Sequence, residues 1–464
     1  MGSGRGIAGG RGKLARRGRE FNYGSIVLIG TGFGAVMFAL SLYNAFVPIF
    51  LDRFVTSTAV IGMIMALDNV AGITLIPYFG AWSDRVRTRI GRRIPFVLSA
   101  MPIGAAAFAL LTGHESIWLF VALDIVFTVA IAAVRAPAVA LMPDLTPPAK
   151  RSTANGIINL LAGVGAALAF VTGGVLYDQD PVAPFRLGAG VMFVVPLLLL
   201  CFIREPAPDA ESARSGGQNT SKRSDLITRP APTTGLDPST EPTPSSESKS
   251  PVAPASVRDR TFLKSLRTLM EPDERDGLRL LIALFVGFAG YASLESFFTL
   301  YATTAAGLTP GEAGGSLVYV SATFVICALP AGLAGAHFGR LTSIAWGMSL
   351  FGAASALLAF VAELAAVRVL LVAIGLSWAL IVVNAYPAVV DRAPTGRIGA
   401  FTGIYYFFTS AGAIAAPVVV GALMDVLGRE RLPFITAAIL LAGAGLLPTK
   451  RPQRRGRQLR RPSQ

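Results

Sequence analysis

The sequence predicts an all-α membrane protein with twelve transmembrane helices in two pseudo-symmetric six-helix bundles. Three observations predict this fold class: a shortage of charge, a series of long apolar stretches, and an internal repeat. Of the 464 residues, 53% are hydrophobic and only 15% are charged, and the mean hydropathy is +0.59. Soluble domains carry about 25% charged residues. Lipid is therefore the expected solvent for much of this chain.

Twelve apolar stretches are long enough to cross a hydrocarbon core of about 30 Å as helices. They are Ser25–Phe50, Ala59–Trp82, Ile94–Thr112, Ile117–Met142, Ala154–Tyr177, Pro184–Ile203, Leu278–Thr303, Ala313–Gly335, Ser343–Val361, Ala366–Val390, Ile398–Met424 and Leu432–Pro448. Their length favours helices over barrel strands, which run only about 10 residues and alternate apolar with polar positions.

The formal charge of +14 is distributed unevenly between the two predicted sides of the membrane. The short loops and chain ends on one side hold 23 Lys and Arg residues, whereas the loops on the other side hold five. Basic residues collect in cytoplasmic loops, so this asymmetry places both termini in the cytoplasm of a multi-pass protein of the cell (cytoplasmic) membrane. Topology thus accounts for the basic charge, and no nucleic-acid partner is predicted.

A change in composition divides the twelve stretches into six and six. Residues 205–257 contain no aromatic residue and are rich in Pro, Ser and Thr, which predicts a disordered cytoplasmic linker. Residues 258–271 predict an amphipathic helix, lying either on the membrane surface or at a solvated junction. The remaining predicted segments are a basic N-terminus (1–24), two bundles (25–204 and 278–449) and a basic tail (450–464).

The two predicted bundles resemble each other in sequence after their fourth helices. Three residues recur in the same order: Asp144 and Asp391, Arg151 and Arg397, and Gly156 and Gly403, at offsets of 247, 246 and 247 residues. Duplication of a six-helix unit is the construction of many secondary transporters, in which the substrate site lies between the repeats near the bilayer midplane.

The loop after the second stretch carries an ordered set of glycine, acidic and basic residues. The predicted gate motif consists of Gly80, Asp84, Arg85, Gly91, Arg92 and Arg93, together with Asp144 and Arg151 after the fourth stretch. Gly80 allows close approach of a neighbouring helix, and Asp84 lies at the membrane boundary, where it can pair with a cation. The alternative is a loop whose arginines serve topology alone.

This loop resembles the signature of the major facilitator superfamily, which runs Gly, three residues, Asp-Arg, then Gly-Arg-Arg. The continuation, 89–96 (Arg-Ile-Gly-Arg-Arg-Ile-Pro-Phe), is similar to the loop of sucrose/proton symporters and the related glycoside–pentoside–hexuronide group, as is 143–147 (Pro-Asp-Leu-Thr-Pro). The resemblance implies the major facilitator fold and a small sugar carried with protons. In the second half, 335–340 is a weakened copy, with Gly339 where an aspartate is expected.

Four ionisable residues lie well inside the predicted helices: Asp68, Asp124, Arg135 and Glu295. Each costs at least about 2.5–3.5 kcal/mol at a helix centre, so each is expected to have a partner or a function. Asp124 and Arg135 share one helix face, about 16 Å apart along the axis. The sucrose symporters, by resemblance, imply Asp124 as the first choice for proton carrier and Arg135 for substrate or counter-charge contact. Arg135 alternatively only holds a carboxylate of a neighbouring helix.

Asp68 and Glu295 are further candidates for proton coupling, because burial of a carboxylate disfavours its charged form. Sodium coupling through the same acids and Asn69 is the alternative. Neutral residues with groups suited to sugar hydroxyls or sugar rings are further candidates for substrate binding. They are Tyr43, Asn44, Asn69, Asn159, Asn384 and Tyr405. Such residues also form hydrogen bonds between helices without contacting any substrate.

The predicted function is proton-coupled symport of a small sugar or glycoside by alternating access, with substrate, proton and membrane lipid as partners. No nucleophile–base pair or metal-ligand set is visible in the sequence, so no enzyme activity, cofactor or metal is predicted. Two alternatives stay open. One is a proton-driven exporter of drugs or metabolites with the same fold, and the other is a transport-dead membrane sensor or scaffold.

Overall fold

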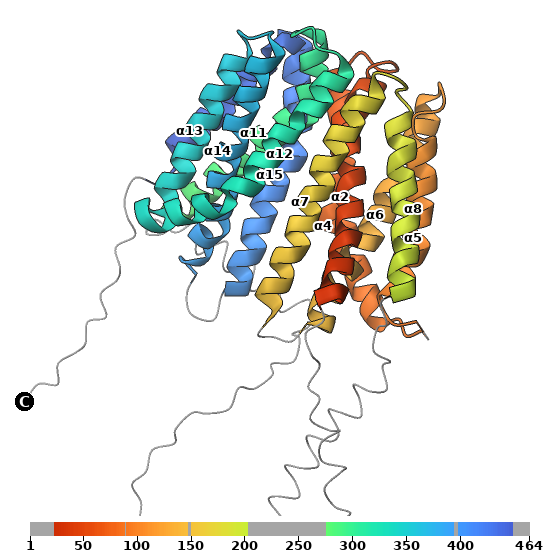
Figure 1. Cartoon of the computed structure of the whole chain (residues 1–464). Helices are drawn as coiled ribbons and strands as arrows, with labels where there is room; N and C mark the ends of the chain where they lie inside the picture. Colours follow the sequence, from red (N-terminus) through yellow and green to blue (C-terminus); the bar gives the residue numbers. More distant parts are fainter. Residues whose placement is uncertain (1–22, 89, 147–149, 203–274, 394–397, 449–464) are drawn as a thin grey trace, which may run out of the picture. The chain divides into compact units, whose positions relative to one another are not determined.

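The computed structural model describes residues 23–88, 90–146, 150–202, 275–393 and 398–448 (Figure 1). The predicted linker (205–257), surface helix (258–271) and basic tail (450–464) lie outside the described residues, as does the N-terminal segment up to residue 22. Within the described residues, regular structure is helical apart from one isolated β-bridge between Thr88 and Gly91.

The helices follow the predicted apolar stretches closely. The first half contains α2 (Tyr23–Leu51), α3 (Thr58–Met65), α4 (Leu67–Arg85), α5 (Ile94–Leu110), α6 (Ile117–Leu145), α7 (Arg151–Tyr177) and α8 (Ala183–Phe202). The second half contains α11 (Arg275–Thr304), α12 (Pro310–Phe338), α13 (Arg340–Leu358), α14 (Leu364–Val390), α15 (Ile398–Leu427), a 3-10 turn (Arg429–Arg431) and α16 (Leu432–Leu446). Each predicted stretch is helical over most of its length.

Ten helical segments in the described part of the chain are long and apolar enough to cross a membrane, with α3 and α4 counted as one segment, Thr58–Arg85. Helix α5 has 17 residues and α16 has 15, so both are shorter than the usual span. The chain is thus a multi-pass helical membrane protein, and the count of twelve crossings stays a prediction. The stretch predicted as one helix from Ala59 is interrupted at Ala66, immediately before α4.

The described residues form two compact units. Unit 1 comprises residues 1–41, 71–169 and 182–260, and unit 2 comprises residues 42–70, 170–181 and 261–464, in each case as far as they are described. The units do not follow the six-and-six division of the sequence, because the ends of α2 and α7, all of α3 and the start of α4 group with the second-half helices. Division into two six-helix bundles stays a prediction.

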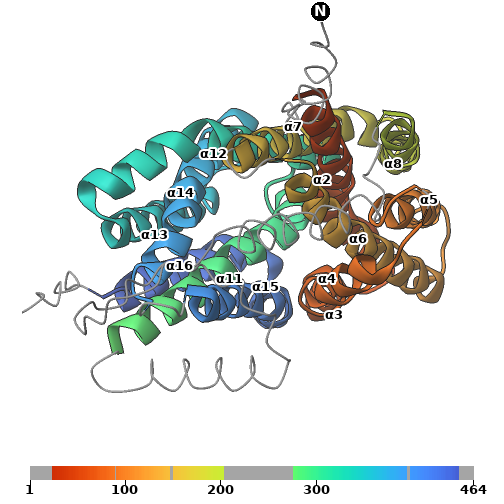
Figure 2. The same cartoon turned by 90° about the horizontal axis from the view of Figure 1, so that it is seen from below.

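Unit 1 is held together by close helix contacts at small residues. Helix α5 packs against α6 and α8, which lie beside it in Figure 2. Helix α7 approaches α2 so closely that a β-carbon on Gly165 would overlap the carbonyl oxygen of Gly34. Small residues allow such backbone approach in membranes, where packing contacts replace the hydrophobic effect between helices.

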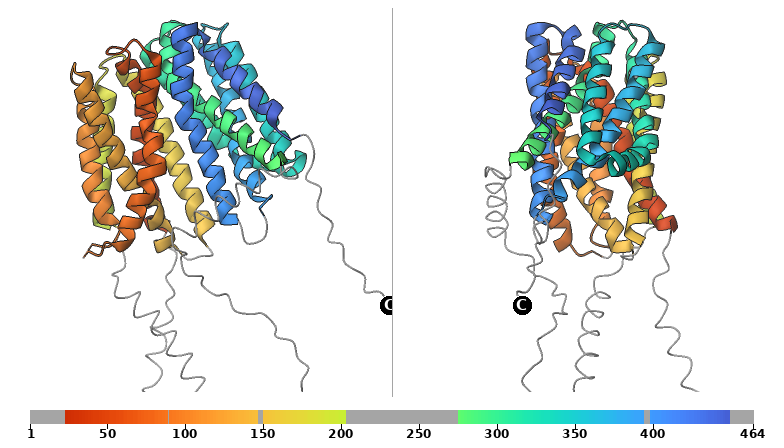
Figure 3. Two further views of the ribbon diagram at one scale, coloured as in Figure 1. Left: turned by 180° about the vertical axis from the view of Figure 1, so that it is seen from behind. Right: turned by 90° about the vertical axis from the view of Figure 1, so that its left-hand side faces the viewer.

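Unit 2 is built around α11 and α14. Helix α14 packs against α12 and α13, and α11 packs against α15 and α16. Figure 3 shows α15, in blue, running alongside α11, in light green. Helix α3 packs against α15 through Gly62 and Gly421, neither of which leaves room for a side chain. These contacts place residues from the first and second halves of the sequence next to each other.

Candidate functional site

Unit 2 contains a cluster of polar and aromatic side chains around Glu295 of α11. The Nδ2 atom of Asn44, on α2, donates a hydrogen bond of 3.3 Å to Oε1 of Glu295. Asp68, in the first turn of α4, lies close enough for its charge to interact with that of Glu295. A predicted carboxylate and a predicted substrate contact are therefore hydrogen-bonded to each other, and a second predicted carboxylate lies nearby on a third helix.

An aromatic wall lies next to these polar groups. The ring of Tyr291, one helical turn before Glu295, stacks on the indole of Trp378 of α14, with 3.8 Å between centroids and 5° between planes. Phe288 meets Trp378 edge-on at 5.0 Å and Tyr405 of α15 at 6.4 Å. We call Asn44, Asp68, Tyr291, Glu295 and Trp378 the Glu295 cluster. Planar polar groups beside aromatic faces suit a small ligand with hydroxyl groups and a ring.

The structure divides the predicted site residues between the two units. Unit 2 holds Tyr43, Asn44, Asp68, Asn69, Glu295, Asn384 and Tyr405, and unit 1 holds Asp124, Arg135 and Asn159. Asp124 is fully enclosed within the protein, Arg135 is half-buried and Asn159 is exposed. Tyr43 is buried, and Asn69 is half-buried beside Asp68. The Glu295 cluster is therefore the part of the predicted site whose members the structure brings together.

Asn384 has a packing role rather than a place in the cluster. Its side chain is 3% exposed, and its Nδ2 atom donates hydrogen bonds to the carbonyl oxygens of Ala331 on α12 and Leu380 on α14, each 3.0 Å long. The absence of a side chain at Gly335 makes room for this amide. The amide hydrogens thus join α12 to α14, and a substrate contact by Asn384 stays a prediction.

Three aromatic residues of the wall, Phe288, Tyr291 and Trp378, were not among the predicted site residues. Phe288 precedes Tyr291 by three positions and Glu295 by seven, so helical periodicity places all three on one face of α11. That pattern was available in the sequence for Phe288 and Tyr291. Trp378 lies on another helix, 87 positions after Tyr291, and no local pattern links the two.

The predicted gate motif forms a compact loop between α4 and α5 within unit 1. Arg93, which is 6% exposed, pairs with Asp84 at 2.7 Å and donates a hydrogen bond of 2.7 Å to Oγ of Ser83. Gly91 adopts a φ of 114°, which favours glycine. Gly80 faces Ala136 of α6, where an added β-carbon would meet it at 3.5 Å, an ordinary contact. The cation expected for Asp84 is therefore an arginine of its own loop.

Other motif residues have different surroundings. Arg85 and Arg151 are exposed, and Arg92 is half-buried. Asp144 lies within α6, but its side chain is outside the described part of the structure. In the weakened second copy, Gly339 has a φ of 97° and Arg340 pairs with Asp391 after α14. A basic–acidic pair is thus present in both halves, although it joins different positions.

Replacing Arg93 by alanine is expected to destabilise the protein by about 1–2 kcal/mol, because a charged hydrogen bond and an ion pair are lost while the exposed Asp84 remains solvated. The midpoint of thermal unfolding in detergent measures this effect. Arg87→Ala is the matched control, since Arg87 is exposed in the same loop. Equal midpoints for the two variants would contradict a structural role for Arg93.

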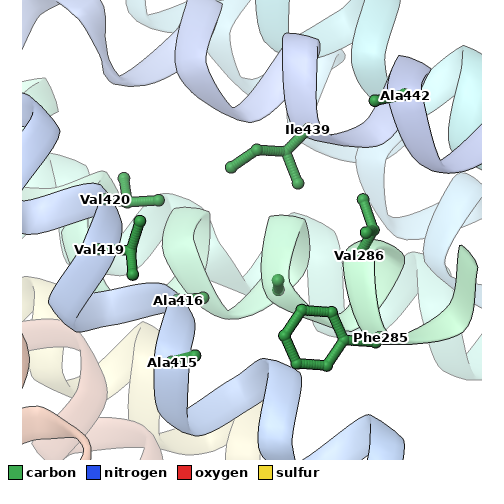
Figure 4. A pocket seen from close by; sticks show the side chains of 9 residues that line it. Phe285, Val286, Ala415, Ala416, Val419, Val420, Ile439 and Ala442 are labelled. Atoms are coloured by element: carbon green, nitrogen blue, oxygen red, sulfur yellow. The ribbon is translucent and has the colours of Figure 1, made fainter. Parts of the chain in front are cut away.

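A separate crevice of about 290 Å³ lies between α11, α15 and α16 (Figure 4). Its lining is entirely apolar: Phe285, Val286, Ala289, Ala415, Ala416, Val419, Val420, Ile439 and Ala442. No member of the Glu295 cluster lines it. A sugar in this crevice would leave its hydroxyl groups without hydrogen-bond partners, which is costly. The crevice is therefore not the candidate site for a polar substrate.

Long apolar helices, tight helix contacts through glycine and a half-buried polar cluster define a membrane transporter of the helical type. The chain belongs to the major facilitator superfamily, whose family model matches residues 29–417 and 280–462. The family predicted from the loop motif is thereby confirmed, and the protein is a transporter, not an enzyme. The solved structure of the nucleoside transporter NupG aligns with 91% of this chain and 98% of its own, with a TM-score of 0.70 and 11% identity. That likeness concerns the fold.

Three curated relatives match parts of the chain. The human proton-associated sugar transporter A is 29% identical over 177 residues, which are 35% of this chain and 23% of that protein. A sucrose transport protein of Arabidopsis thaliana is 28% identical over 171 residues, or 32% of this chain and 29% of that protein. The class D tetracycline resistance protein of Salmonella ordonez is 26% identical over 167 residues, or 36% and 41%. The chain thus matches less than half the length of each of these relatives and resembles sugar/proton symporters among them.

Proposed function

We propose that this protein carries a small sugar or glycoside across the cytoplasmic membrane together with protons. In this proposal, twelve helices cross the membrane with both termini in the cytoplasm, and two six-helix bundles rock to expose the site alternately to each side. The observation that carries the proposal is the Asn44–Glu295 hydrogen bond, because it places a half-buried carboxylate of one half of the sequence in contact with a polar side chain of the other.

The substrate proposal rests on the chemistry of the Glu295 cluster. Amide and carboxylate groups satisfy the hydroxyls of a sugar, and the Tyr291–Trp378 wall offers a flat apolar surface to a sugar ring. Two of the partial relatives are named as sugar or sucrose transporters, which supports the same substrate class. Asn44 is thus the proposed polar contact, with Tyr405 beside the wall. Asn69, Arg135 and Asn159 stay predictions.

The proton proposal rests on the proximity of Asp68 to Glu295. A neighbouring carboxylate disfavours the charged form of the other, and the low dielectric of a membrane interior strengthens this effect. Glu295 is half-buried and Asp124 is enclosed, and a proton carrier has to reach water from both sides in turn. We therefore place proton coupling first at Asp68 and Glu295, with Asp124 as the second candidate.

A second candidate function is proton-driven export of lipophilic compounds. It is favoured by the partial match to a tetracycline resistance protein. The Glu295 cluster favours the sugar, because a lipophilic substrate that displaced water would leave the amide of Asn44 and the carboxylate of Glu295 with no partner other than each other.

Uptake of labelled sucrose, maltose and simple glucosides into proteoliposomes holding the purified protein tests the proposal. We expect an inward proton gradient to drive accumulation of at least one of these sugars, and dissipation of the gradient to abolish it. Empty liposomes and an inhibited gradient are the controls. No sugar accumulation, together with proton movement triggered by cationic or lipophilic compounds, would overturn the sugar proposal in favour of export.

A further inference from the structure

Two aspartates at the ends of long helices bond to the beginnings of other helices within unit 2. Asp178 directly follows α7. Its Oδ2 atom accepts a hydrogen bond of 2.7 Å from Oγ1 of Thr309, and its Oδ1 atom accepts one of 2.8 Å from the backbone N–H of Gly311. Thr309 is the N-cap residue of α12. Asp178 thus reinforces the cap of a helix from the second half of the sequence.

Asp425, in the last turn of α15, makes the corresponding contact with α3. It accepts hydrogen bonds from Oγ of Ser57 at 2.6 Å and from the backbone N–H groups of Thr58 and Ala59 at 2.5 and 3.1 Å. Ser57 is the N-cap residue of α3. The first N–H groups of a helix lack partners within the helix and form its positive end. A carboxylate from another helix accepts hydrogen bonds from these N–H groups and places a negative charge next to the positive end.

The two contacts are related by the internal repeat of the sequence. Asp425 follows Asp178 by 247 residues, which is also the offset between Asp144 and Asp391. The glycine one turn before each aspartate recurs at the same offset, as Gly174 and Gly421. Both aspartates therefore occupy one position of the duplicated unit.

These glycines are also in close contact with the capped helices. A β-carbon on Gly174 would lie 2.8 Å from the carbonyl oxygen of Gly311, and one on Gly421 would overlap the carbonyl of Thr58. Both copies of the repeat thus contain the same contact, which consists of a close backbone approach at a glycine and a capping carboxylate. Each copy joins one half of the sequence to the other, α7 to α12 and α15 to α3.

We propose that Asp178 and Asp425 are a matched pair of gate residues, which hold one end of the transport pathway closed by capping the N-termini of helices from the opposite half of the chain. The inference rests on the alternating rocking in the proposed function. When the halves separate at this end, both caps break and water replaces the carboxylates. Both aspartates are exposed, so water reaches them readily and the contact stays reversible.

Arg429, four residues after Asp425, adds a bond beside one of the two caps. It pairs with Asp52 at 2.5 Å and donates a hydrogen bond of 3.0 Å to the carbonyl oxygen of Thr56. The position 247 residues earlier is Val182, which has no charge, so this pair has no counterpart in the repeat. The elements shared by the two contacts are therefore the capping aspartate and the glycine one turn before it.

Distances between spin labels test the gate in the absence of any substrate. One label pair, introduced by Val175→Cys on α7 and Ala305→Cys in the connection between α11 and α12, lies beside the α7–α12 contact. A second pair, introduced by Met63→Cys and Leu423→Cys, spans the α3–α15 contact. All four positions are exposed. The native cysteines, Cys201 and Cys327, are first replaced by serine. The distance between the labels of each pair is measured in proteoliposomes by pulsed electron paramagnetic resonance, for the parent protein and for each aspartate variant.

We expect Asp178→Ala and Asp425→Ala each to shift the ratio of short to long label distances toward the long distance by about fivefold, an effect comparable to that of losing one helix-capping interaction. The double variant is expected to shift it by about 25-fold if the two caps act independently. The substitutions Asp178→Asn and Asp425→Asn keep an acceptor oxygen and are therefore expected to give smaller shifts. They replace the alanine variants in the experiment if those fold poorly.

Asp276→Asn is the matched control, since it neutralises an exposed aspartate in the first turn of α11. It is expected to leave both distance distributions unchanged. Unchanged distances in the double variant, with or without a lower melting temperature, would overturn the gate and leave the caps a purely structural role. Because no sugar is present, a failed uptake experiment and a failed gate remain distinguishable.

Discussion

In a Glu295→Gln variant, the ratio of internal to external substrate under an inward proton gradient is expected to fall to about one, because the coupling between proton and substrate is lost. Exchange of substrate without net accumulation is expected to persist, since glutamine still accepts the hydrogen bond from Asn44. Parallel measurements of accumulation and counterflow in proteoliposomes separate the two activities.

The control for this variant is Glu363→Gln, which makes the same chemical change at an exposed residue before α14 that forms no capping bond. It should accumulate substrate normally. Full gradient-driven accumulation by Glu295→Gln would remove Glu295 as a proton carrier and would make Asp124→Asn the next variant to measure. Loss of exchange as well as accumulation would instead indicate that the charge of Glu295 is needed for substrate binding.

In a Gly165→Val variant, the yield of folded protein is expected to fall sharply, with a loss of stability of about 3 kcal/mol or more. The added side chain would overlap the carbonyl oxygen of Gly34, a backbone atom that cannot move aside as a flexible side chain can. Helices α2 and α7 would then have to separate, and their packing contacts would be lost. Size-exclusion chromatography and thermal unfolding in detergent measure the effect.

Gly156→Val, on the same helix, is the matched comparison because the space around Gly156 is open. It carries the same cost of a β-branched residue in a helix without the clash. Its yield and melting temperature are expected to remain close to those of the parent protein. A Gly165→Val variant as stable as Gly156→Val would mean that α2 and α7 do not pack at this point.

The positions of the helices could be predicted from the sequence because hydropathy is a local property. Helix α12 runs from Pro310 to Phe338, against a predicted apolar stretch of Ala313–Gly335. The ends of the helices were harder to predict, because polar capping residues such as Thr309 lie outside the apolar stretch. The break at Ala66 was missed, because residues on both sides are apolar and no proline stands at that position.

The family was predictable from a short loop, because the motif residues act on one another over short sequence distances. Asp84 and Arg93 are nine positions apart and form an ion pair in the structure. For the candidate substrate site, the sequence predicted a set of residues but not which of them lie next to each other. Glu295 and Asn44 were both expected in the site and are hydrogen-bonded to each other, whereas the amide of Asn384 bonds to a neighbouring helix and its substrate contact stays a prediction.

The sequence by itself determined the membrane class, the helix positions, the internal repeat and the short inventory of buried charges, since composition and spacing carry these properties directly. Only the tertiary structure decided which members of that inventory meet. Asn44 and Glu295 are 251 residues apart in the sequence. Asp178 and Asp425 form hydrogen bonds with helices of the other half of the sequence. Such contacts depend on how helices pack through glycines and small side chains, and that packing is a property of the whole fold rather than of any local pattern.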